Sequence, residues 1–284
     1  MIDYLEIPLG GASPDRAAEF DPDGDAPAID LEEVERRIHA SSLKNARLLG
    51  GEPLAHPWLD EVIGLLRVHN FQRLRVQTSG WPLQDRERSD QFFKMGVRLF
   101  EVRFLSSRRG EHDGLAGRRG SFAAAQAALK QVKQAGEELR GGGPTFLEAR
   151  LVVVPENLAT LERTLAEAGS WPVHQLAVVP GRRPFSLAQA AAAIRRGIEH
   201  ALNHKRWVYL EKWPACLFPK LELHLRELTR KLEGDQSFLP ECASCPHRVF
   251  CAGVPPWFRQ GEEPLAPPAP SHHDWGKFHA RVIL

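Results

Sequence analysis

The sequence predicts an α/β protein: a partial (β/α)6 barrel of the TIM type, followed by a small C-terminal extension that contains cysteines. Strand-like and helix-like segments alternate six times along the first two thirds of the 284 residues. Their connections are mostly short, which favours a parallel sheet in which each helix is a crossover. After about residue 206 the alternation stops, and all four cysteines follow. We therefore expect a barrel domain over residues 1–206 and an extension over residues 207–284.

The first three units are set by β-rich runs, apolar periodicity and turn residues. Asp30 is a plausible N-cap for the first helix. Between the first strand and that helix, the run "GGASPDRAAEFDPDGDAPA" is rich in Gly, Pro and Asp and is expected to be a long loop. The expected strands are residues 2–10, 46–51 and 73–80, and the expected helices are residues 30–42, 57–70 and 85–96.

The next three units follow the same pattern. Ser121 and Ser186 are predicted N-caps, and Gly136 is predicted to lie just past the end of a helix. The expected strands are residues 97–106, 145–155 and 173–180, and the expected helices are residues 121–136, 157–169 and 186–205. In the extension, residues 207–219 could supply one more strand, and residues 220–234 have the periodicity of an amphipathic helix.

Composition narrows the classes of function. The chain is 43% hydrophobic and 26% charged, and its 37 basic and 36 acidic residues leave a formal net charge of +1. This balance offers no electrostatic basis for binding nucleic acid or an anionic membrane. The Arg-rich runs "SSRRGEHDGLAGRRG" and "PGRRPF" are expected to be solvated loops. The sequence lacks the pattern of a signal peptide and any apolar run of about 20 residues, so we expect a cytoplasmic protein.

Three motifs follow successive predicted strands: "GGEPLAHP", then "TSG", then "EHDGLAGRRGSF". In this order, and at the strand ends where α/β barrels build their sites, they resemble the radical S-adenosylmethionine superfamily. The resemblance is closest to members with a C-terminal SPASM or twitch extension, and it covers roughly residues 1–260. It implies that Gly50, Gly51, Glu52, Thr78 and Ser79 form a vestigial S-adenosylmethionine site. In that family the glutamate binds the amino group of the ligand, and glycines let the backbone approach it.

The chain departs from the family where the radical chemistry begins. The family carries Cys-x3-Cys-x2-Cys in the loop after the first strand, and these thiolates hold the cluster that reduces S-adenosylmethionine. Here that loop has no cysteine or histidine, and the first 215 residues contain no cysteine. His112 and Asp113 survive from a later motif, but the arginine position is Ala116. We therefore do not expect the usual radical reaction, and binding of S-adenosylmethionine itself is not predicted.

Three cysteines lie within the stretch "ECASCPHRVFCAG", as Cys242-x2-Cys245-x5-Cys251, and the fourth is Cys216. The spacing matches the auxiliary-cluster segment of SPASM and twitch extensions, which implies one 4Fe-4S cluster held by all four thiolates. A structural zinc ion with the same ligands is the alternative. His247 could replace a thiolate in either site, and four reduced cysteines without metal are the remaining interpretation.

Three functions remain open. The first is a pseudoenzyme: a non-catalytic partner of an active radical enzyme, or of its precursor peptide, in peptide or natural-product maturation. Tryptophans in "SGWP", "GSWP", "EKWP" and "PPWF" would form its contact surface or, alternatively, cap the barrel. The second is an enzyme with altered chemistry or electron transfer through the cluster. Its candidate polar groups are Glu52, His56, Thr78, Arg103, His112 and Glu148. The third is a module that binds a small anion through Arg103, Arg108 and Arg150, unless these pair with Glu101 and Glu148.

Overall fold

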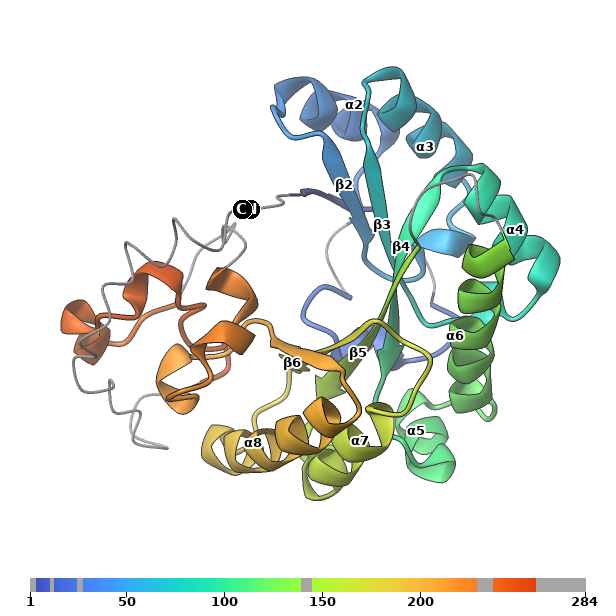
Figure 1. Ribbon diagram of the computed structural model, residues 1–284. Coiled ribbons are helices and arrows are strands. Elements are labelled where there is room, and N and C mark those ends of the chain that lie inside the picture. The colour runs from blue at the N-terminus through green and yellow to red at the C-terminus, as the bar shows by residue number, and fades with distance from the viewer. Residues whose placement is uncertain (1–3, 11–12, 25–27, 139–144, 229–236, 259–284) are drawn as a thin grey trace.

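The computed structural model describes residues 4–10, 13–24, 28–138, 145–228 and 237–258. Within these ranges seven strands form one sheet in chain order, and every neighbouring pair is parallel. The open, curved sheet confirms the predicted α/β class and the partial barrel (Figure 1). The strands are β1 (Leu5–Pro8), β2 (Asn45–Leu49), β3 (Arg73–Thr78), β4 (Val97–Phe104), β5 (Phe146–Val153), β6 (Gln175–Pro180) and β7 (Trp207–Leu210).

The predicted crossover helices are all present, and two of the three predicted N-caps are confirmed. The third, Ser121, is the first residue of its helix and not the cap before it. Asp30 accepts a hydrogen bond from the Glu33 amide (2.8 Å), and Ser186 accepts one from the Gln189 amide (3.2 Å). Gly136 does not end its helix, which continues for two more residues; it lies where the Thr145 side chain approaches the backbone too closely for a Cβ atom. The helices are α2 (Leu31–Ala40), α3 (Leu59–Val68), α4 (Arg86–Lys94), α6 (Ser121–Glu138), α7 (Leu161–Ala168) and α8 (Leu187–Asn203).

Two segments expected to be loops contain helices instead. The short α1 (Ala17–Phe20) lies in the long loop after β1, and α5 (Arg109–Ala116) lies in the first Arg-rich run. Both helices are amphipathic, but the Gly, Pro and Arg residues in these segments hide the apolar pattern. Ala17, Phe20 and Ala116 belong to one small buried cluster. Helix α5 ends at Gly117, which has a left-handed conformation. The apolar contact stabilises turns that have little intrinsic helix propensity.

The helix predicted over residues 220–234 is wrong for the part that the structure describes. Residues up to 228 form two 3-10 turns, η5 (Glu222–His224) and η6 (Arg226–Leu228), and residues 229–234 lie outside the described ranges. Between the turns, Leu225 forms a β-bridge with Leu210 and is buried. The side chains of Arg226 and Glu227 are also buried against the sheet. Tertiary contacts have therefore overridden the helical periodicity.

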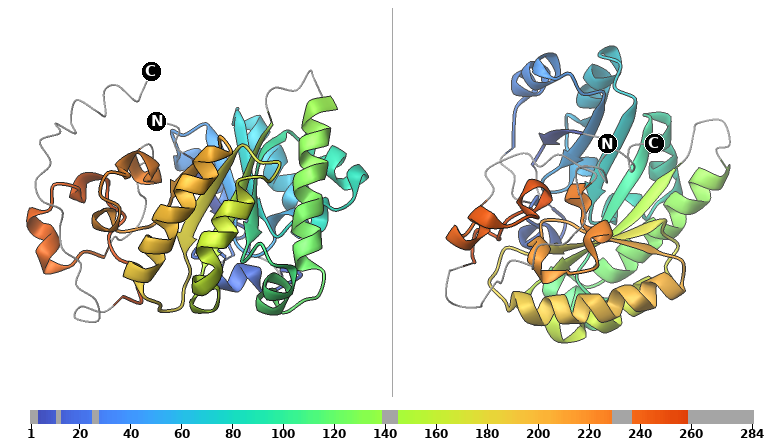
Figure 2. Two further views of the ribbon diagram at one scale, coloured as in Figure 1. Left: turned by 60° about the horizontal axis from the view of Figure 1, so that its bottom comes forward. Right: turned by 60° about the vertical axis from the view of Figure 1, so that its left-hand side comes forward.

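The two faces of the sheet differ in chemistry. Side chains alternate between the faces along each strand. The outer face is apolar, and Phe100, Val102 and Leu147 join one large core with the surrounding helices (Figure 2). The inner face carries charged and polar side chains that are buried or nearly so: Arg47, Arg75, Gln77, Glu101, Arg103, Glu148, Arg150 and Gln175.

The sheet continues past residue 206, because β7 pairs with β6. After β7 the chain forms short 3-10 turns beside the last strands, on the side away from α4 and α6 (Figure 1). These are η4 (Ala215–Leu217), η7 (Pro240–Ser244) and η8 (Arg248–Phe250), and an antiparallel bridge joins Ser237 to Val254. Among the described residues, no helix has the length and apolar character that crossing a bilayer requires.

Candidate functional site

The residues of the predicted S-adenosylmethionine site come together at the carboxyl ends of β2 and β3. Gly50 and Gly51 both adopt positive φ (84° and 53°), which turns the chain sharply after β2. This turn directs Glu52 into the protein, where its Oε2 accepts hydrogen bonds from the amide (2.7 Å) and hydroxyl of Ser79. Thr78 accepts a hydrogen bond from the Gly80 amide (3.0 Å).

Glu52 lies next to Arg103, which reaches across from β4. Arg103 donates a hydrogen bond to the Gly51 carbonyl. Burial raises the pKa of the Glu52 carboxyl, while Arg103 and the hydrogen bonds from Ser79 and Thr78 oppose that rise. Within the described residues, Glu52 Oε1 and the Nε and Nη1 atoms of Arg103 have no hydrogen-bond partner. The pair therefore retains polar atoms that a ligand could satisfy.

A segment of the chain itself closes the mouth of the barrel above this pair. We call residues 13–24 the plug segment. Its helix α1 packs on Leu105, Val152, Val154 and Val179, at the carboxyl ends of β4, β5 and β6. Its last residue, Gly24, accepts a hydrogen bond from the Gly51 amide (2.7 Å). Glu52 is only 1% exposed in this arrangement.

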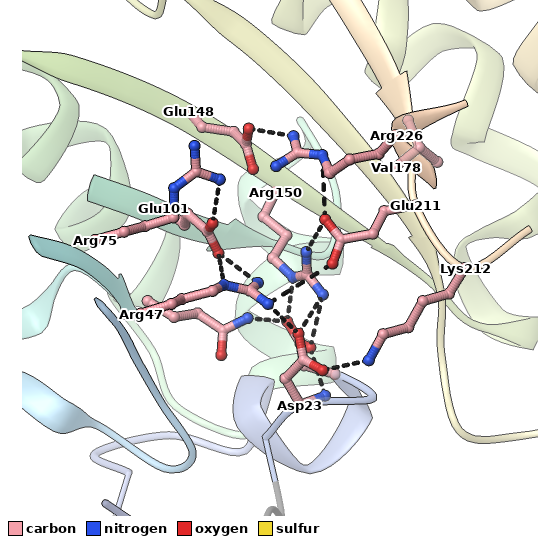
Figure 3. Close-up of polar contacts among 12 residues, drawn as sticks. Asp23, Arg47, Arg75, Glu101, Glu148, Arg150, Val178, Glu211, Lys212 and Arg226 are labelled. Carbon is pink, nitrogen blue, oxygen red and sulfur yellow. Dashed lines mark hydrogen bonds and ion pairs between the residues drawn. The ribbon is translucent and has the colours of Figure 1, made fainter. Parts of the chain in front are cut away.

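Two aspartates anchor the plug segment to the inner face of the sheet. Asp21 accepts hydrogen bonds from Arg150 (2.8 Å) and Gln77 (3.0 Å). Asp23 forms ion pairs with Arg150 (2.9 Å), Arg47 (3.1 Å) and Lys212. Figure 3 shows Arg47, Arg150 and Lys212 pointing towards Asp23 from three different parts of the fold. These interactions hold the pKa of Asp23 far below its usual range despite its burial.

The network extends deeper into the barrel. Glu101 accepts from Arg47 (2.6 Å) and Arg75 (2.8 Å), and although burial opposes it, its pKa is lowered to about 2. Glu211 bridges Arg150 (3.1 Å) and Arg226 (3.3 Å). Glu148 pairs with Arg226 (Figure 3). Glu148 also accepts a hydrogen bond from Gln175. Carboxylates and cations therefore neutralise one another within the chain.

This network changes the interpretation of the arginines. Arg103 and Arg150 lie side by side on β4 and β5, but Arg103 turns to Gly51 and Arg150 to the plug segment, while Arg108 is exposed at the start of α5. The three do not form one anion site, and neither buried arginine pairs with Glu101 or Glu148. The charged alternation along the strands, as in "RLRVQT" and "FLEAR", was the signal that could have revealed a polar inner face.

The surviving histidine and aspartate of the third motif have structural contacts. His112 is buried, its Nδ1 accepts from the Leu105 amide (3.1 Å), and burial lowers its pKa to about 4. Asp113 accepts from the amides of Gly120 (2.9 Å) and Phe122 (2.8 Å) at the start of α6. His56 is half-buried, and in the described residues its side chain has hydrogen-bond and ring contacts only with its neighbour Trp58.

The four cysteines surround one cavity outside the barrel. Cys216 lies on η4, Cys242 on η7, and Cys245 and Cys251 directly after η7 and η8. The cavity wall is completed by Pro214, Leu239, Glu241, Gly253 and Val254. Cys251 is buried and the other three are half-buried. None forms a disulfide, so four thiols separated by up to 35 positions in the chain share a single space.

Burial disfavours the charged form of two thiols in the cavity. Burial raises the pKa of Cys216 to about 12, and the other three cysteines add to that rise. Burial also raises the pKa of Cys251, although the amides of Ala215 and Gly253 donate to its sulfur (both 3.3 Å). Backbone N–H groups directed at sulfur are a common second layer around thiolate-bound metals. In the described residues, no three His, Cys, Asp or Glu side chains are gathered tightly enough to hold a single ion.

Comparisons with known proteins place the fold. No protein-family model matches the sequence, and no curated protein matches it. Among solved structures, Streptococcus suis SuiB bound to precursor peptide SuiA is similar with a TM-score of 0.54 at 12% identity, over 78% of this chain and 52% of that chain. Methylornithine synthase (PylB) gives a TM-score of 0.53 at 10% identity, over 74% and 65%. SuiB bound to S-adenosylmethionine gives 0.51 at 11% identity, over 74% and 46%.

These similarities concern the fold, because the identities are low. The chain shares its fold with SuiB, which was solved bound to a precursor peptide, and with methylornithine synthase. It spans about half the length of SuiB. The cysteine cavity and the plug segment are formed by this chain's own residues.

Proposed function

We propose that the protein is a non-catalytic, radical-S-adenosylmethionine-like subunit that carries one 4Fe-4S cluster in its C-terminal extension and acts with an active radical enzyme in peptide or natural-product maturation. The observation that carries the proposal is the cysteine cavity beside a closed barrel. All the cysteines of the chain line that cavity. The barrel mouth, where such a fold holds its ligands, is filled by the chain itself.

The four thiols surround one shared cavity, which supports a single metal centre. In a 4Fe-4S cluster each thiolate binds a different iron, whereas around one zinc ion all four sulfurs lie about 2.3 Å from a common point. We propose the cluster because the cysteine spacing matches the auxiliary-cluster segment of SPASM and twitch extensions. When bound, the cluster would supply electron transfer or rigidity; Cys216, Cys242, Cys245 and Cys251 would hold it, and the amides of Ala215 and Gly253 would stabilise the Cys251 thiolate.

The closed barrel supports the non-catalytic role. The loop after β1 has no cysteine to hold a reducing cluster. In this loop, Asp21 pairs with Arg150 and Asp23 pairs with Arg47. The Gly24 carbonyl accepts a hydrogen bond from the Gly51 amide. An oxygen ligand set engaged in ion pairs has neither the softness nor the freedom to bind iron–sulfur clusters.

The partner role is supported by the shared fold with a peptide-bound maturation enzyme and by the surface of the extension. The tryptophans considered as contacts mostly pack inside: Trp213 and Trp171 are buried, and Trp257 packs on the main core. Large apolar side chains are exposed both after residue 206, at Trp207, Leu223 and Val249, and before it, at Trp58, Val68 and Leu202. Those of the extension are our candidates for the contact surface, because exposed aromatic and aliphatic residues are typical of interfaces.

Anaerobic purification and reconstitution test the metal centre and the absence of catalysis together. We expect about four iron atoms per chain, a brown protein, and no deoxyadenosine from S-adenosylmethionine and dithionite. A colourless protein with one zinc ion would replace the cluster with the structural alternative. Cleavage of S-adenosylmethionine above a protein-free control would contradict a non-catalytic barrel.

Co-expression tests the partner. If an intact radical enzyme is encoded beside the gene for this protein, the two proteins should co-elute on size exclusion. We expect their interface to bury on the order of 1,600 Å². Replacing Trp207 and Leu223 with Ser should weaken that complex, whereas the same change at the exposed Val68 on α3 should not. Independent monomers at micromolar concentration, with and without the precursor peptide, would contradict the partner role.

A second function, altered chemistry in the old ligand pocket, has one observation in its favour. Glu52 and Arg103 keep buried polar atoms that have no hydrogen-bond partner among the described residues. Calorimetric titration with S-adenosylmethionine and S-adenosylhomocysteine tests this second function. Binding that is abolished by Glu52→Gln would favour it. If neither ligand produces heat, the second function is contradicted and the partner role remains.

A further inference from the structure

We propose that metal binding at the cysteine cavity tightens the closure of the barrel mouth, because residues 211–216 join the plug segment to the metal ligands. The inference rests on the proposed metal centre and concerns what that centre controls. It assigns a function to residues 211–216, which connect the barrel to the cavity.

At the barrel end, the connection begins with Lys212. Its ammonium group pairs with Asp23 of the plug segment. Its backbone is held in the left-handed region (φ 64°), which costs a non-glycine residue energy. The amide of Lys212 donates to the Glu227 carboxylate (2.7 Å), and this contact fixes the strained conformation. The position of the ammonium group therefore depends on how this short segment is held.

The middle of the connection is tightly packed. The Glu211 amide donates to the Val178 carbonyl (3.0 Å), and its carboxylate bridges Arg150 and Arg226. Trp213 is fully buried, and its indole N–H donates to the same Val178 carbonyl (2.9 Å). The side chains on both sides of Lys212, those of Glu211 and Trp213, are held by these contacts. The segment can therefore move only as a unit, so a displacement at one end is transmitted to the other.

At the other end, the connection enters the cavity wall. Pro214 and Cys216 line the cavity, and the Ala215 amide donates to the sulfur of Cys251 (3.3 Å). Cys216 is only four residues beyond Lys212. A bound metal fixes the four sulfurs relative to one another, and so restrains the backbone that carries Cys216 and the Ala215 amide. Metal binding thus fixes the segment that positions Lys212 against Asp23.

The two events are coupled in both directions, as linkage requires. A loaded cavity makes opening of the plug segment rarer, and an opened plug segment weakens metal binding by the same factor. Coupling free energies of this kind correspond to about 5- to 150-fold in an equilibrium constant. The protein would then expose its buried Glu52 and Arg103 more often when the metal is absent.

Hydrogen exchange on the full chain tests the coupling. The protein is prepared reconstituted with iron and sulfide, or depleted with a chelator, and its metal content is measured separately. We expect amides of the plug segment, such as those of Arg16, Asp21 and Gly24, to exchange at least about 5-fold more slowly in the loaded protein. Amides of β5, which lie in the core of the sheet, should exchange at equal rates in both samples.

Lys212→Met keeps the aliphatic stem and removes the ion pair with Asp23, which retains Arg47 and Arg150. This variant should bind metal normally, yet its plug segment should exchange at one rate with and without metal. Lys44→Met, which removes an exposed contact with the His69 carbonyl, is the matched control and should behave as wild type.

The outcomes separate the two proposals. A protein that binds no metal overturns the proposed centre and the coupling with it. A protein that binds metal while plug exchange stays unchanged overturns the coupling only. Metal-dependent exchange that persists in Lys212→Met overturns the route through Lys212.

Discussion

The inner face of the sheet and the cysteine cavity both gather many chemically active side chains, but they differ in what completes them. On the inner face, the carboxylates of Asp21, Asp23, Glu101, Glu148 and Glu211 meet the cations of Arg47, Arg75, Arg150, Lys212 and Arg226. In the cavity, four thiols face one another without a cation among the described residues, and burial raises the pKa of Cys216 and Cys251.

The difference separates structure from binding. A buried charge that is paired within the chain needs no ligand, and removing one partner leaves the other uncompensated. Thiols whose pKa is raised by burial and by one another are stabilised as thiolates only when a cation arrives. Charged residues at barrel strand ends are usually interpreted as catalytic. Here most of them are paired within the chain, whereas all four cysteines lie in the extension.

Cys251→Ser should have the largest effect. It removes the most buried ligand, and metal binding contributes on the order of 10 kcal/mol to small metal sites. We expect iron content to fall from about four atoms per chain to near zero, with residues 237–258 becoming sensitive to protease while the barrel stays folded. Ser244→Ala, an exposed change between two of the ligands, is the control. Full iron content in the Ser variant would contradict the four-cysteine site.

Arg150→Met should destabilise the barrel itself. Asp21, Asp23 and Glu211 would all lose a buried partner, which typically costs about 3–5 kcal/mol. Urea unfolding followed by circular dichroism measures the change. Arg196→Met removes only the exposed pair with Glu162 and should cost less than about 1 kcal/mol. Equal effects of the two variants would show that the inner-face network does not hold the barrel together.

Glu227→Gln should change the pH dependence of stability. Burial raises the pKa of Glu227 to about 7 from 4.5, against the hydrogen bond from the Lys212 amide. A carboxyl that binds its proton more tightly when folded loses stability as pH rises from its unfolded pKa through its folded one. Wild type should therefore lose about 3 kcal/mol relative to Glu227→Gln between pH 4.5 and pH 8.

The comparison with that variant is needed because His112 acts in the opposite direction. Its pKa is lowered to about 4 from 6.5, so its contribution to stability is lost as pH falls through that range. His112 is unchanged in both proteins, and its contribution cancels in the difference between their unfolding free energies. A difference that stays constant from pH 4.5 to pH 8 would mean that Glu227 is not protonated in the folded protein.

Arg118→Ala should have the smallest effect, and only on the plug segment. Arg118 lies over the Trp81 ring (3.8 Å) and donates to the Pro14 carbonyl (2.9 Å) at the molecular surface. Its loss should cost about 1 kcal/mol and speed proteolysis within residues 13–24. Arg88→Ala, which removes a similar contact with Phe92 away from the plug segment, should leave that cleavage unchanged.

Local patterns were sufficient for much of the fold. The alternation of apolar periods, with caps at Asp30 and Ser186, predicted the strands, their parallel order and the crossover helices. The same patterns failed for residues 220–234, because Leu225 completes a bridge to Leu210 that no local period encodes. They also missed α1, whose few residues become helical only on the apolar ends of three strands.

The sequence by itself determined the chemistry available: no cysteine before residue 216, a Cys-x2-Cys-x5-Cys run after it, and a turn of two glycines before Glu52. The tertiary structure decided which groups meet. Only folding brings Cys216 to the other thiols, and only folding brings Asp21 and Asp23 onto Arg150, more than a hundred residues away. Residue types and spacings are local properties, whereas the pairing of buried charges depends on long-range closure that no short window of sequence contains.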